Sequence, residues 1–533
     1  MSCITKQRVG KYTYLYESTS YRDTDGKPRN KKVRIGKLNL ITGKPIYNQE
    51  YFDRMADAGT PIKIVPTETI ANIEVNTFVL SAVDTLRDYG VFYLLQSIAT
   101  KIGLEQVLSN SIPAFWKEIF MLSCYLISSD KPVMYCEDWI TSNESLNVGS
   151  MSSQRISELL VSFGKKEREA FYQLWCGHIT EQEYMALDIT SVSSYSELIT
   201  ECEWGYNRDH ENLPQINLCM LFGEDSKLPV FQTVYSGSLK DVSTLPNTLA
   251  EVTTLIGNKK VMIVMDKGFF STKNINTLLS DYESCRFLIS MPFTCGFAKK
   301  QVESECKDID QISNTILTSG TPIRGIHKVR VWGTKGKKLH THILFNPEKA
   351  LKERNNLYGY VTWLKELALR EPNNSKHSAD ISKYLIVRKS EKSGYTVNIR
   401  EDIIEHELST AGWVVLISNH IDNTQKAHDI YRTKDVVEKG FWKYKNSLGM
   451  DRLHVHSNER MHNKTFVTFI SLIMMSYIHK VMKEKKLYRK MTFDKLLLTL
   501  AKIKVITING KRVIHPLTKE QATIFKSFDI ELP

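Results

Sequence analysis

The chain reads MALDITSVSSYS at residues 185–196, QINLCMLFG at 215–223 and LPVFQTVYSG at 228–237. Polar or Gly-containing turns separate these strand-like runs, so we expect three consecutive antiparallel strands. Two further apolar runs each follow a helical pattern and predict a buried strand: VMIVMDKGFF (261–270) and CRFLISMP (285–292). Strands that alternate with helices in this way indicate an α/β core.

Residues 296–405 break this rhythm because they are polar and charge-rich. Four strands are expected among them, at KVRVWG (328–333), LHTHILFN (339–346), KYLIVRKS (383–390) and YTVNI (395–399). One more core strand is expected downstream, in AGWVVLISNH. The sequence therefore predicts a mainly β insertion inside an α/β domain.

The two ends of the chain show weaker patterns. Residues 11–40 predict short strands around a turn at Asp25-Gly26. Residues 66–180 have apolar side chains at helical spacing and predict a mostly helical region. The tail from Met482 is Lys-rich and is expected to be helical, with a final hairpin whose turn is Asn509-Gly510.

The formal net charge is +12, and it is distributed unevenly along the 533 residues. Residues 1–40 carry +7 and residues 439–533 carry +12, so the middle of the chain carries −7. Two basic ends that flank an acidic centre suit a polyanionic partner, and the acidic centre can supply carboxylates to a metal site. A soluble basic surface without such a partner would give the same charge.

Nine cysteines are scattered without a C-x-x-C pair, which argues against a zinc site or a disulfide framework and favours reduced cytosolic thiols. The N-terminus lacks the apolar core of a secretory signal. The most apolar run, FVTFISLIMMSYI (466–478), has thirteen residues, fewer than the roughly 20 that span a bilayer. We expect this run to be a buried helix, and we expect no membrane association.

The segment YRTKDVVEKGFWKYK, residues 431–445, predicts an amphipathic helix. At ~100° per residue, one face carries the side chains of Tyr431, Lys434, Glu438 and Lys445. An adjoining apolar stripe consists of Val437, Phe441, Tyr444 and Leu448. A lone carboxylate among cations suggests a site for metal and phosphate, and a solvated charged face is the alternative of about equal weight.

Two further acids fall at positions where the predicted strands place functional groups. Asp188 lies in the centre of the first strand, where an ionised carboxylate is costly unless a cation compensates it. Asp266 ends VMIVMD, and the C-terminal edge of a parallel strand usually opens onto a ligand site. Only the fold can bring these acids to Glu438, because the separations are 78 and 172 residues. Each acid also has an ordinary explanation, as a helix cap or as a surface residue.

Three carboxylates suit Mg²⁺ or Mn²⁺ better than zinc. Two such ions about 4 Å apart activate a water or a 3′-hydroxyl and stabilise the leaving oxygen at a phosphodiester. Asp188, on the central strand, is the candidate ligand shared by both ions. Lys434 and Lys445 are expected to hold the neighbouring phosphates, and Tyr431 to donate a hydrogen bond to a phosphate oxygen.

These residues resemble bacterial insertion-sequence transposases with a DDE triad and a YREK signature. The resemblance extends over most of residues 11–480 and includes the stretches KPRNKKVRIGKLN (27–39), GYNRDHENLPQINLCML (205–221), GSLKDVSTL (237–245) and RLHVHSNERMHNKTFVTFISLIM (452–474). It implies that Asp188, Asp266 and Glu438 are the metal ligands. The signature positions fall on Tyr431, Lys434 and Lys445. Lys434 stands where the family has arginine, which keeps the charge but loses the bidentate fork.

The resemblance implies an α/β, ribonuclease-H-like fold: a mixed sheet with flanking helices, interrupted by a β-rich insertion, plus N-terminal small β and helical DNA-binding regions. The expected segments are an N-terminal basic β segment (1–45), a mainly helical DNA-binding region (46–180), the first part of the catalytic core (181–295), the insertion (296–405), the second part of the core (406–480) and a basic C-terminal region (481–533).

The implied function is a DNA transposase that uses two Mg²⁺ or Mn²⁺ ions. It would cut double-stranded DNA at the terminal inverted repeats of its mobile element and join the 3′-hydroxyl ends to target DNA. A homodimeric synaptic complex and a bacterial, cytoplasmic, nucleoid-associated location are also implied. Two alternatives stay open: a catalytically silent DNA-binding regulator or domesticated transposase, and a hydrolytic nuclease on the same fold.

Related enzymes often hold a flipped base with an aromatic side chain. Trp332 or Trp363, both in the insertion, would serve, although packing in a small β core is the simpler explanation for each.

Overall fold

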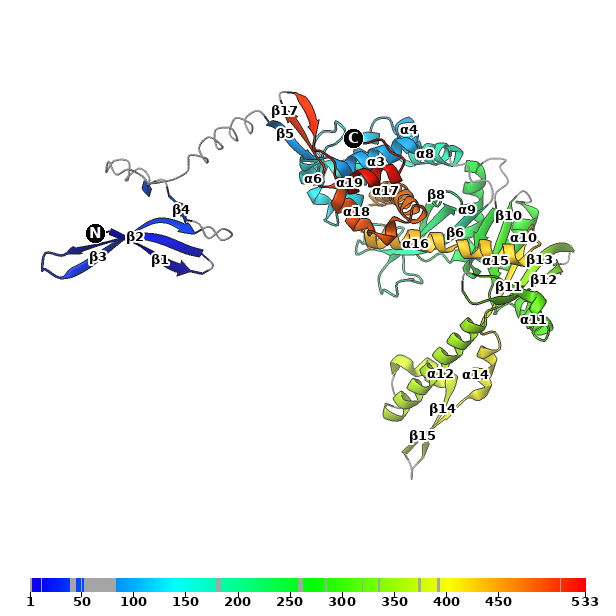
Figure 1. The fold of residues 1–533 in the computed structure, drawn as a ribbon. Coiled ribbons are helices and arrows are strands. Elements are labelled where there is room, and N and C mark those ends of the chain that lie inside the picture. Colours follow the sequence, from blue (N-terminus) through cyan, green and yellow to red (C-terminus); the bar gives the residue numbers. More distant parts are fainter. Residues whose placement is uncertain are drawn as a thin grey trace. The chain divides into compact units, whose positions relative to one another are not determined.

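The computed structural model describes residues 2–10, 12–38, 45–48, 50–51, 83–178, 184–256, 262–282, 285–318, 320–333, 336–371, 375–390, 394–508 and 510–533. The chain forms two compact units, Met1–Val83 and Asp84–Pro533, and each is described by itself (Figure 1).

The first unit is an antiparallel sheet with the strand order β1-β2-β3-β4. Its strands are β1 (Ser2–Val9), β2 (Tyr12–Arg22), β3 (Pro28–Leu38) and β4 (Pro45–Tyr47). The turn between β2 and β3 contains Gly26 at a φ of 78°, where glycine avoids the strain of a side chain. The Asp23 carboxylate accepts hydrogen bonds from the amides of Asp25 and Lys27 in this turn. The predicted strands around Asp25-Gly26 are therefore confirmed.

The second unit is built on a nine-stranded sheet with the order β11-β12-β13-β16-β10-β9-β6-β7-β8. The three consecutive antiparallel strands are β6 (Met185–Ser193), β7 (Gln215–Gly223) and β8 (Pro229–Ser236). β9 (Met262–Met265) lies parallel to β6 and to β10 (Arg286–Met291), and β16 (Trp413–Ser418) runs antiparallel to β10. This mixed sheet confirms the predicted α/β core. Helix α9 (Asp241–Ile256) connects β8 to β9, and α10 (Thr272–Ser280) connects β9 to β10.

The four strands predicted within residues 296–405 are confirmed, but the prediction that this segment is mainly β is wrong. β11 (Thr315–Ile316), β12 (Ile323–Trp332) and β13 (Lys337–Phe345) extend the main sheet beside β16. Around and beyond them the chain forms α11 (Gly296–Glu305), α12 (Pro347–Arg370), α13 (Ser378–Tyr384) and α14 (Glu401–Leu408). The hairpin of β14 (Leu385–Ser390) and β15 (Gly394–Ile399) packs against α12, and a separate apolar cluster holds these elements together (Figure 1).

The sequence of the long helix α12 contains helix-start and spacing signals, which the polar composition of the segment obscured. The Asn346 side chain accepts a hydrogen bond from the Lys349 amide, and Pro347 occupies the first turn. Val361, Leu364 and Ala368 then repeat at helical spacing and are buried.

The predicted helical region is confirmed from residue 90 onward, and its part at residues 66–82 lies outside the described residues. Its helices are α3 (Gly90–Lys101), α4 (Leu104–Ser111), α5 (Trp116–Ser128), α6 (Cys136–Ser142), α7 (Ser153–Leu159) and α8 (Lys165–His178). The expectation is wrong at β5 (Val83–Asp88), which joins β17 (Lys504–Ile508) and β18 (Lys511–Ile514) in a second sheet. Its partner strand is at the other end of the chain, so no local pattern could reveal it. The predicted β17–β18 hairpin is confirmed, between α18 (Phe493–Leu500) and α19 (Lys519–Ser527), and Asn509 of its predicted turn lies outside the described residues.

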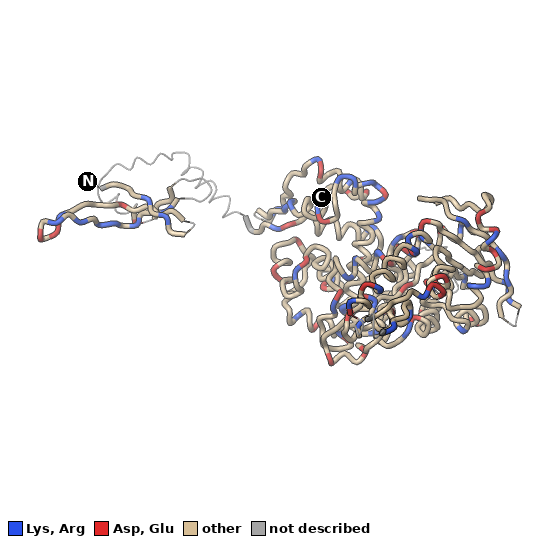
Figure 2. Tube along the Cα trace, turned by 90° about the horizontal axis from the view of Figure 1, so that it is seen from below, with Lys and Arg blue, Asp and Glu red and all other residues tan. Residues whose placement is uncertain are grey.

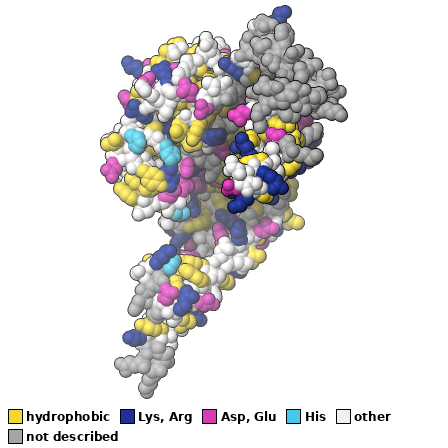
Figure 3. Space-filling model, turned by 90° about the vertical axis from the view of Figure 1, so that its left-hand side faces the viewer, with side chains coloured by type: hydrophobic (Ala, Val, Ile, Leu, Met, Phe, Trp, Pro, Cys, Tyr) yellow, Lys and Arg dark blue, Asp and Glu magenta, His cyan; other side chains and the backbone are white. Residues whose placement is uncertain are grey.

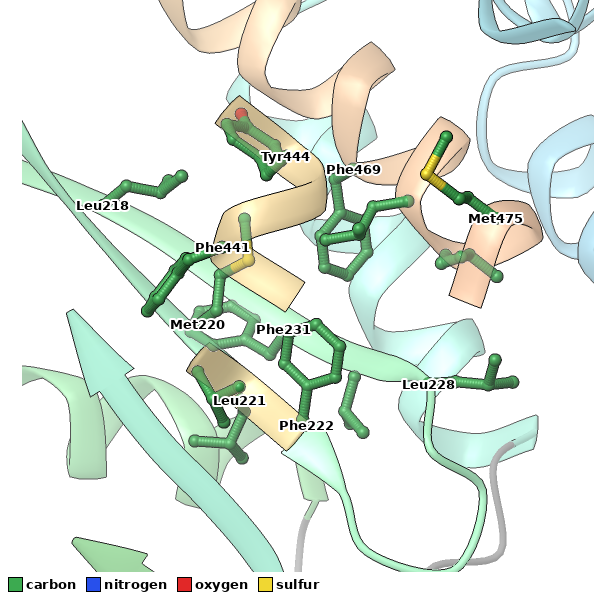
Figure 4. Packing of buried hydrophobic residues seen from close by; sticks show 14 of the residues in the cluster. Leu218, Met220, Leu221, Phe222, Leu228, Phe231, Phe441, Tyr444, Phe469 and Met475 are labelled. Atoms are coloured by element: carbon green, nitrogen blue, oxygen red, sulfur yellow. The ribbon is translucent and has the colours of Figure 1, made fainter. Parts of the chain in front are cut away.

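The predicted buried helix is the centre of α17 (Asn458–Glu484). It is long and apolar enough to cross a membrane, but most of it is buried inside the protein, against α5 and β8. Figure 4 shows the Phe469 ring of α17 pointing toward Phe222 and Phe231 of the sheet, and Met475 of α17 belongs to the same buried cluster. The face of the sheet formed by β7 and β8 is therefore covered by α17, with the predicted 431–448 helix packed beside it.

Candidate active site

Asp188 and Asp266 lie side by side because their strands are parallel neighbours. Leu187 on β6 is paired with Met265 on β9, and each aspartate is the next residue along its strand. The Asp188 side chain is 18% exposed and that of Asp266 is 38% exposed. The two carboxylates therefore open to solvent at the C-terminal end of β9, as parallel strand ends usually do.

Glu438 reaches the same place from a helix that is anchored on the sheet. The predicted helix is α15 (Thr424–Thr433) and α16 (Asp435–Trp442), joined at Lys434, which also has helical dihedral angles. The predicted apolar stripe is confirmed, because Val437, Phe441, Tyr444 and Leu448 are all buried. Gly440 lets α16 approach β7 closely: a Cβ there would lie 2.2 Å from the Phe222 ring.

Lys434 occupies the point at which the three carboxylates converge. Its ammonium nitrogen is 3.5 Å from Asp188 Oδ2, 3.5 Å from Asp266 Oδ2 and 3.0 Å from Glu438 Oε1. Its side chain is only 10% exposed. The three acids that the sequence separates are thus brought together around one cation.

Tyr431 completes the cluster from the other side of Asp266. Its hydroxyl donates a hydrogen bond of 2.9 Å to Asp266 Oδ1, and the residue is partly buried. Burial and the neighbouring carboxylate raise the pKa of Tyr431 well above its ordinary value, so the hydroxyl keeps its proton. The sequence predicts that Tyr431 donates a hydrogen bond to a phosphate oxygen. In this structure its hydroxyl donates to a triad carboxylate instead.

Burial and Lys434 act in opposite directions on the carboxyl groups. Burial raises the pKa of Asp188, and Lys434 offsets only part of this effect. Burial also acts to raise the pKa of Asp266, but Lys434 and hydrogen bonds outweigh it, so the pKa is lowered. For Lys434, burial lowers the pKa, and the three carboxylates outweigh it and hold the pKa above its ordinary value. Lys434 is a permanent cation here.

Lys445 does not share this arrangement. Residues Lys443–Ser447 form a π-helical turn, which alters the angular position that an ideal helix gives to Lys445. Its ammonium pairs with Asp209 Oδ2 at 2.5 Å. The prediction that four signature residues share one face therefore applies to three of them, and Lys445 contacts the loop between β6 and β7 instead.

That loop contains functional candidates that sequence reasoning missed. Arg208 pairs with Asp241 on α9, and Glu211 pairs with Arg452. Together with Asp209–Lys445, these ion pairs tie the loop to α9, to the π-helical turn and to the segment before α17. The residues lie in stretches that the family resemblance marked, but nothing local indicated how they pair.

The donor set fits Mg²⁺ or Mn²⁺, because three carboxylates supply only oxygen ligands and converge on a position that already attracts a cation. As arranged, no three His, Cys, Asp or Glu side chains among the described residues are placed to hold a metal ion. The ammonium of Lys434 lies between the three carboxylates. A metal ion would have to take its place.

An open cavity of about 1060 Å³ adjoins the cluster. Its lining includes Asp266 and Tyr431 of the cluster, together with Lys299, Lys349 and His406. On the face shown in Figure 3, acidic and basic side chains are interspersed rather than gathered in one patch.

The two tryptophans considered for base stacking differ in their surroundings. Trp332 is buried, donates a hydrogen bond to Asn276 and packs edge-on against Phe270 and Phe297. Trp363 is 42% exposed on α12 and stacks on Tyr360. The simpler explanation, packing, describes Trp332, and Trp363 lies on a helix rather than in a β core.

Comparisons with known proteins place this site in a wider context. A family model described as the transposase DDE domain matches residues 180–474, which include the triad and Tyr431. A solved structure described as a cryo-EM structure of the piggyBac transposase synaptic complex with hairpin DNA is similar, with 11% identity and a TM-score of 0.37. The similarity covers 77% of this chain and 76% of that chain. No curated protein matches the sequence at a significant level.

Proposed function

Since a transposase DDE domain accounts for more than half of its residues, the chain belongs to the DDE transposase family, and we propose that it cuts DNA at the terminal inverted repeats of a mobile element and joins the ends to target DNA. The observation that carries this proposal is the convergence of Asp188, Asp266 and Glu438 on one cation position. Divalent ions held there would activate a water or 3′-hydroxyl and stabilise the leaving oxygen.

The residues around the triad have separate roles in this proposal. The three carboxylates would hold two Mg²⁺ or Mn²⁺ ions, and Asp188, on a central strand of the sheet, would be the ligand that the ions share. Tyr431 orients Asp266 through its hydrogen bond. Lys434 and Lys445 bind phosphates of the DNA strand next to the scissile bond: Lys434 is the cation among the triad carboxylates, and Lys445 is a cation nearby in the same helical segment, paired with Asp209.

The spacing of Tyr431, Lys434, Glu438 and Lys445 supports membership of the YREK group of bacterial insertion-sequence transposases. On this assignment the protein is bacterial and nucleoid-associated and acts as a homodimer. Residues 181–295 and 406–480 are the two parts of the ribonuclease-H-like core, since they contain β6 to β10 and β16 with α15 and α16. Residues 46–180 contact DNA, and residues 481–533 form a basic C-terminal region.

The test is cleavage of a labelled duplex that carries the element's terminal repeat. We expect cutting only with Mg²⁺ or Mn²⁺, and joining of the new 3′ ends to a second duplex, both seen on a denaturing gel. EDTA is expected to abolish both steps. Cutting without joining would identify a hydrolytic nuclease, and DNA binding without cutting in any divalent ion would identify a silent regulator; either result contradicts the proposal.

The N-terminal sheet is a second DNA-binding candidate, and one of its faces is chemically suited to the task. Strand register places six side chains on this face, which we name the tyrosine face: Tyr12, Tyr14, Tyr16, Lys32, Arg34 and Lys37. The Arg34 guanidinium lies 4.1 Å from the Tyr14 ring centroid. This cation–π contact holds the guanidinium in place, so binding to a phosphate would cost little side-chain conformational entropy. Leu15 and Ile35 are buried on the opposite face.

Charge supports DNA as the ligand of the tyrosine face. None of the described strand residues on this face is acidic, and Figure 2 shows Lys and Arg recurring along the strands of this unit. Lys32, Arg34 and Lys37 are all exposed. Cations that alternate with aromatic rings are suited to phosphates and bases together.

Replacing Arg34 and Lys37 by alanine is expected to weaken duplex binding and to reduce its salt dependence. Each lost phosphate contact lowers the slope of log Kobs against log salt by about 0.9, so the double variant should lose up to about 1.8. Fluorescence anisotropy at several salt concentrations measures this. The matched control is Arg29→Ala with Lys31→Ala on the opposite face, where Arg29 already pairs with Asp23. Equal slopes for both variants would refute the assignment.

A further inference from the structure

Lys434 is held in a way that an ordinary surface ion pair does not explain. One ammonium group lies within 3.5 Å of oxygens from three different carboxylates, on two strands and one helix. The side chain is almost completely buried, while Glu438 remains 57% exposed. The carboxylates therefore surround the lysine as they would surround a bound cation.

The charge balance at this position is incomplete. Three ionised carboxylates carry −3, and one ammonium supplies +1, so the cluster keeps a net charge of −2. Asp266 receives a further hydrogen bond from Tyr431, which contributes a dipole but no charge. A divalent ion would compensate the three acids better than the lysine does, and the two cannot share the same few ångströms.

The side chain of Lys434 can also leave the cluster without unfolding of the helices that carry it. Lys434 lies at the junction of α15 and α16, and its backbone has ordinary helical dihedral angles of −51° and −27°. Its long side chain has four rotatable bonds, so a change of rotamer withdraws the ammonium while the helices stay in place. A phosphate beside the triad would give the displaced ammonium a new partner.

We propose that Lys434 is a tethered cation that occupies the metal position of the DNA-free protein and moves onto the substrate phosphate when DNA binds. This inference rests on the proposed function and adds regulation to it: DNA and metal bind with positive coupling, because each favours the state in which the lysine has left the cluster. The coupling is reciprocal, since it is a property of binding free energies.

The first test measures Mn²⁺ binding to the full chain without DNA, by electron paramagnetic resonance of free Mn²⁺. Lys434→Met removes the competing charge and is expected to lower the Mn²⁺ dissociation constant at least about tenfold. Its apo form is expected to melt below wild type and to regain more stability on adding Mn²⁺. Lys439→Met is the matched control, because Lys439 is exposed on the same helix and pairs only with Asp435 among the described residues.

Two more variants keep the test decisive. Lys434→Gln keeps a hydrogen-bond donor without charge, and it replaces Lys434→Met if that variant does not fold without metal. Lys434→Arg keeps the charge and is expected to resemble wild type in both melting temperature and Mn²⁺ affinity. If the side chain at position 434 only filled space, Lys434→Arg would not keep the wild-type melting temperature and Mn²⁺ affinity.

The second test measures coupling. A duplex with the terminal repeat, added in Ca²⁺ and followed by calorimetry, is expected to tighten Ca²⁺ binding to wild type but much less to Lys434→Met. Equal metal affinity in wild type and both neutral variants, or loss of metal binding in them, overturns the tethered-cation proposal alone. Absence of metal binding in every variant overturns it together with the proposed metal-dependent reaction.

Discussion

Asp188→Asn is expected to abolish DNA cleavage, with a fall of at least about 10³-fold in the single-turnover rate. In the proposed two-ion arrangement, an amide cannot replace the carboxylate that both divalent ions would share. Such ions contribute several kcal/mol to transition-state stabilisation, where ~4 kcal/mol is about 10³-fold. Duplex binding is expected to persist, because phosphate contacts elsewhere on the protein do not involve Asp188. Cleavage and gel-shift assays on the same preparation measure the two effects.

Loss of activity in this variant is not expected to come from unfolding. Burial raises the pKa of Asp188, which means that ionising this carboxyl group costs more free energy in the folded protein than in water. A neutral asparagine avoids that cost, so the melting temperature is expected to stay at or above that of wild type. Asp435→Asn is the control on α16, since Asp435 pairs with exposed Lys439. Cleavage by Asp188→Asn at the control's rate would contradict a catalytic role for the triad.

The two aspartates could be predicted because their local sequence carries the information. A carboxylate inside an apolar strand, and another at the end of a parallel strand, are unusual enough to mark a site. Glu438 was found because a helical face can be read from spacing, and the buried stripe of Val437, Phe441 and Tyr444 fixes which way that face points. The core strands and the position of the acids thus follow from short-range patterns.

The remaining features depend on contacts between distant segments. Nothing near Lys434 indicates that its ammonium lies between three carboxylates, because two of them come from strands more than 150 residues away. The pairing of Lys445 with Asp209 depends on a π-helical turn, which spacing arguments based on an ideal helix miss. The strand β5 similarly depends on a partner near the other end of the chain.

Gly440→Ala is expected to reduce cleavage about 10²-fold and to destabilise the protein, although residue 440 touches no substrate. The added Cβ would lie 2.2 Å from Cζ of Phe222, whose ring is buried in the core and cannot move aside freely (Figure 4). Overpacking of this kind costs about 1–3 kcal/mol. Relief requires α16 to shift away from β7, and a displacement of about 1 Å at a catalytic group can cost ~10²-fold in rate. Single-turnover cleavage and thermal melting measure both effects.

Gly359→Ala is the matched control for this steric argument. Gly359 also lies inside a helix, α12, but a Cβ there would meet nothing within 4 Å. Alanine is a better helix former than glycine by about 1 kcal/mol, so this variant is expected to be slightly stabilised and fully active. The same substitution is thus expected to destabilise the protein at position 440 and to stabilise it slightly at position 359, and the difference is due to Phe222. If Gly440→Ala behaved like Gly359→Ala, close packing of α16 on β7 would not be what positions Glu438.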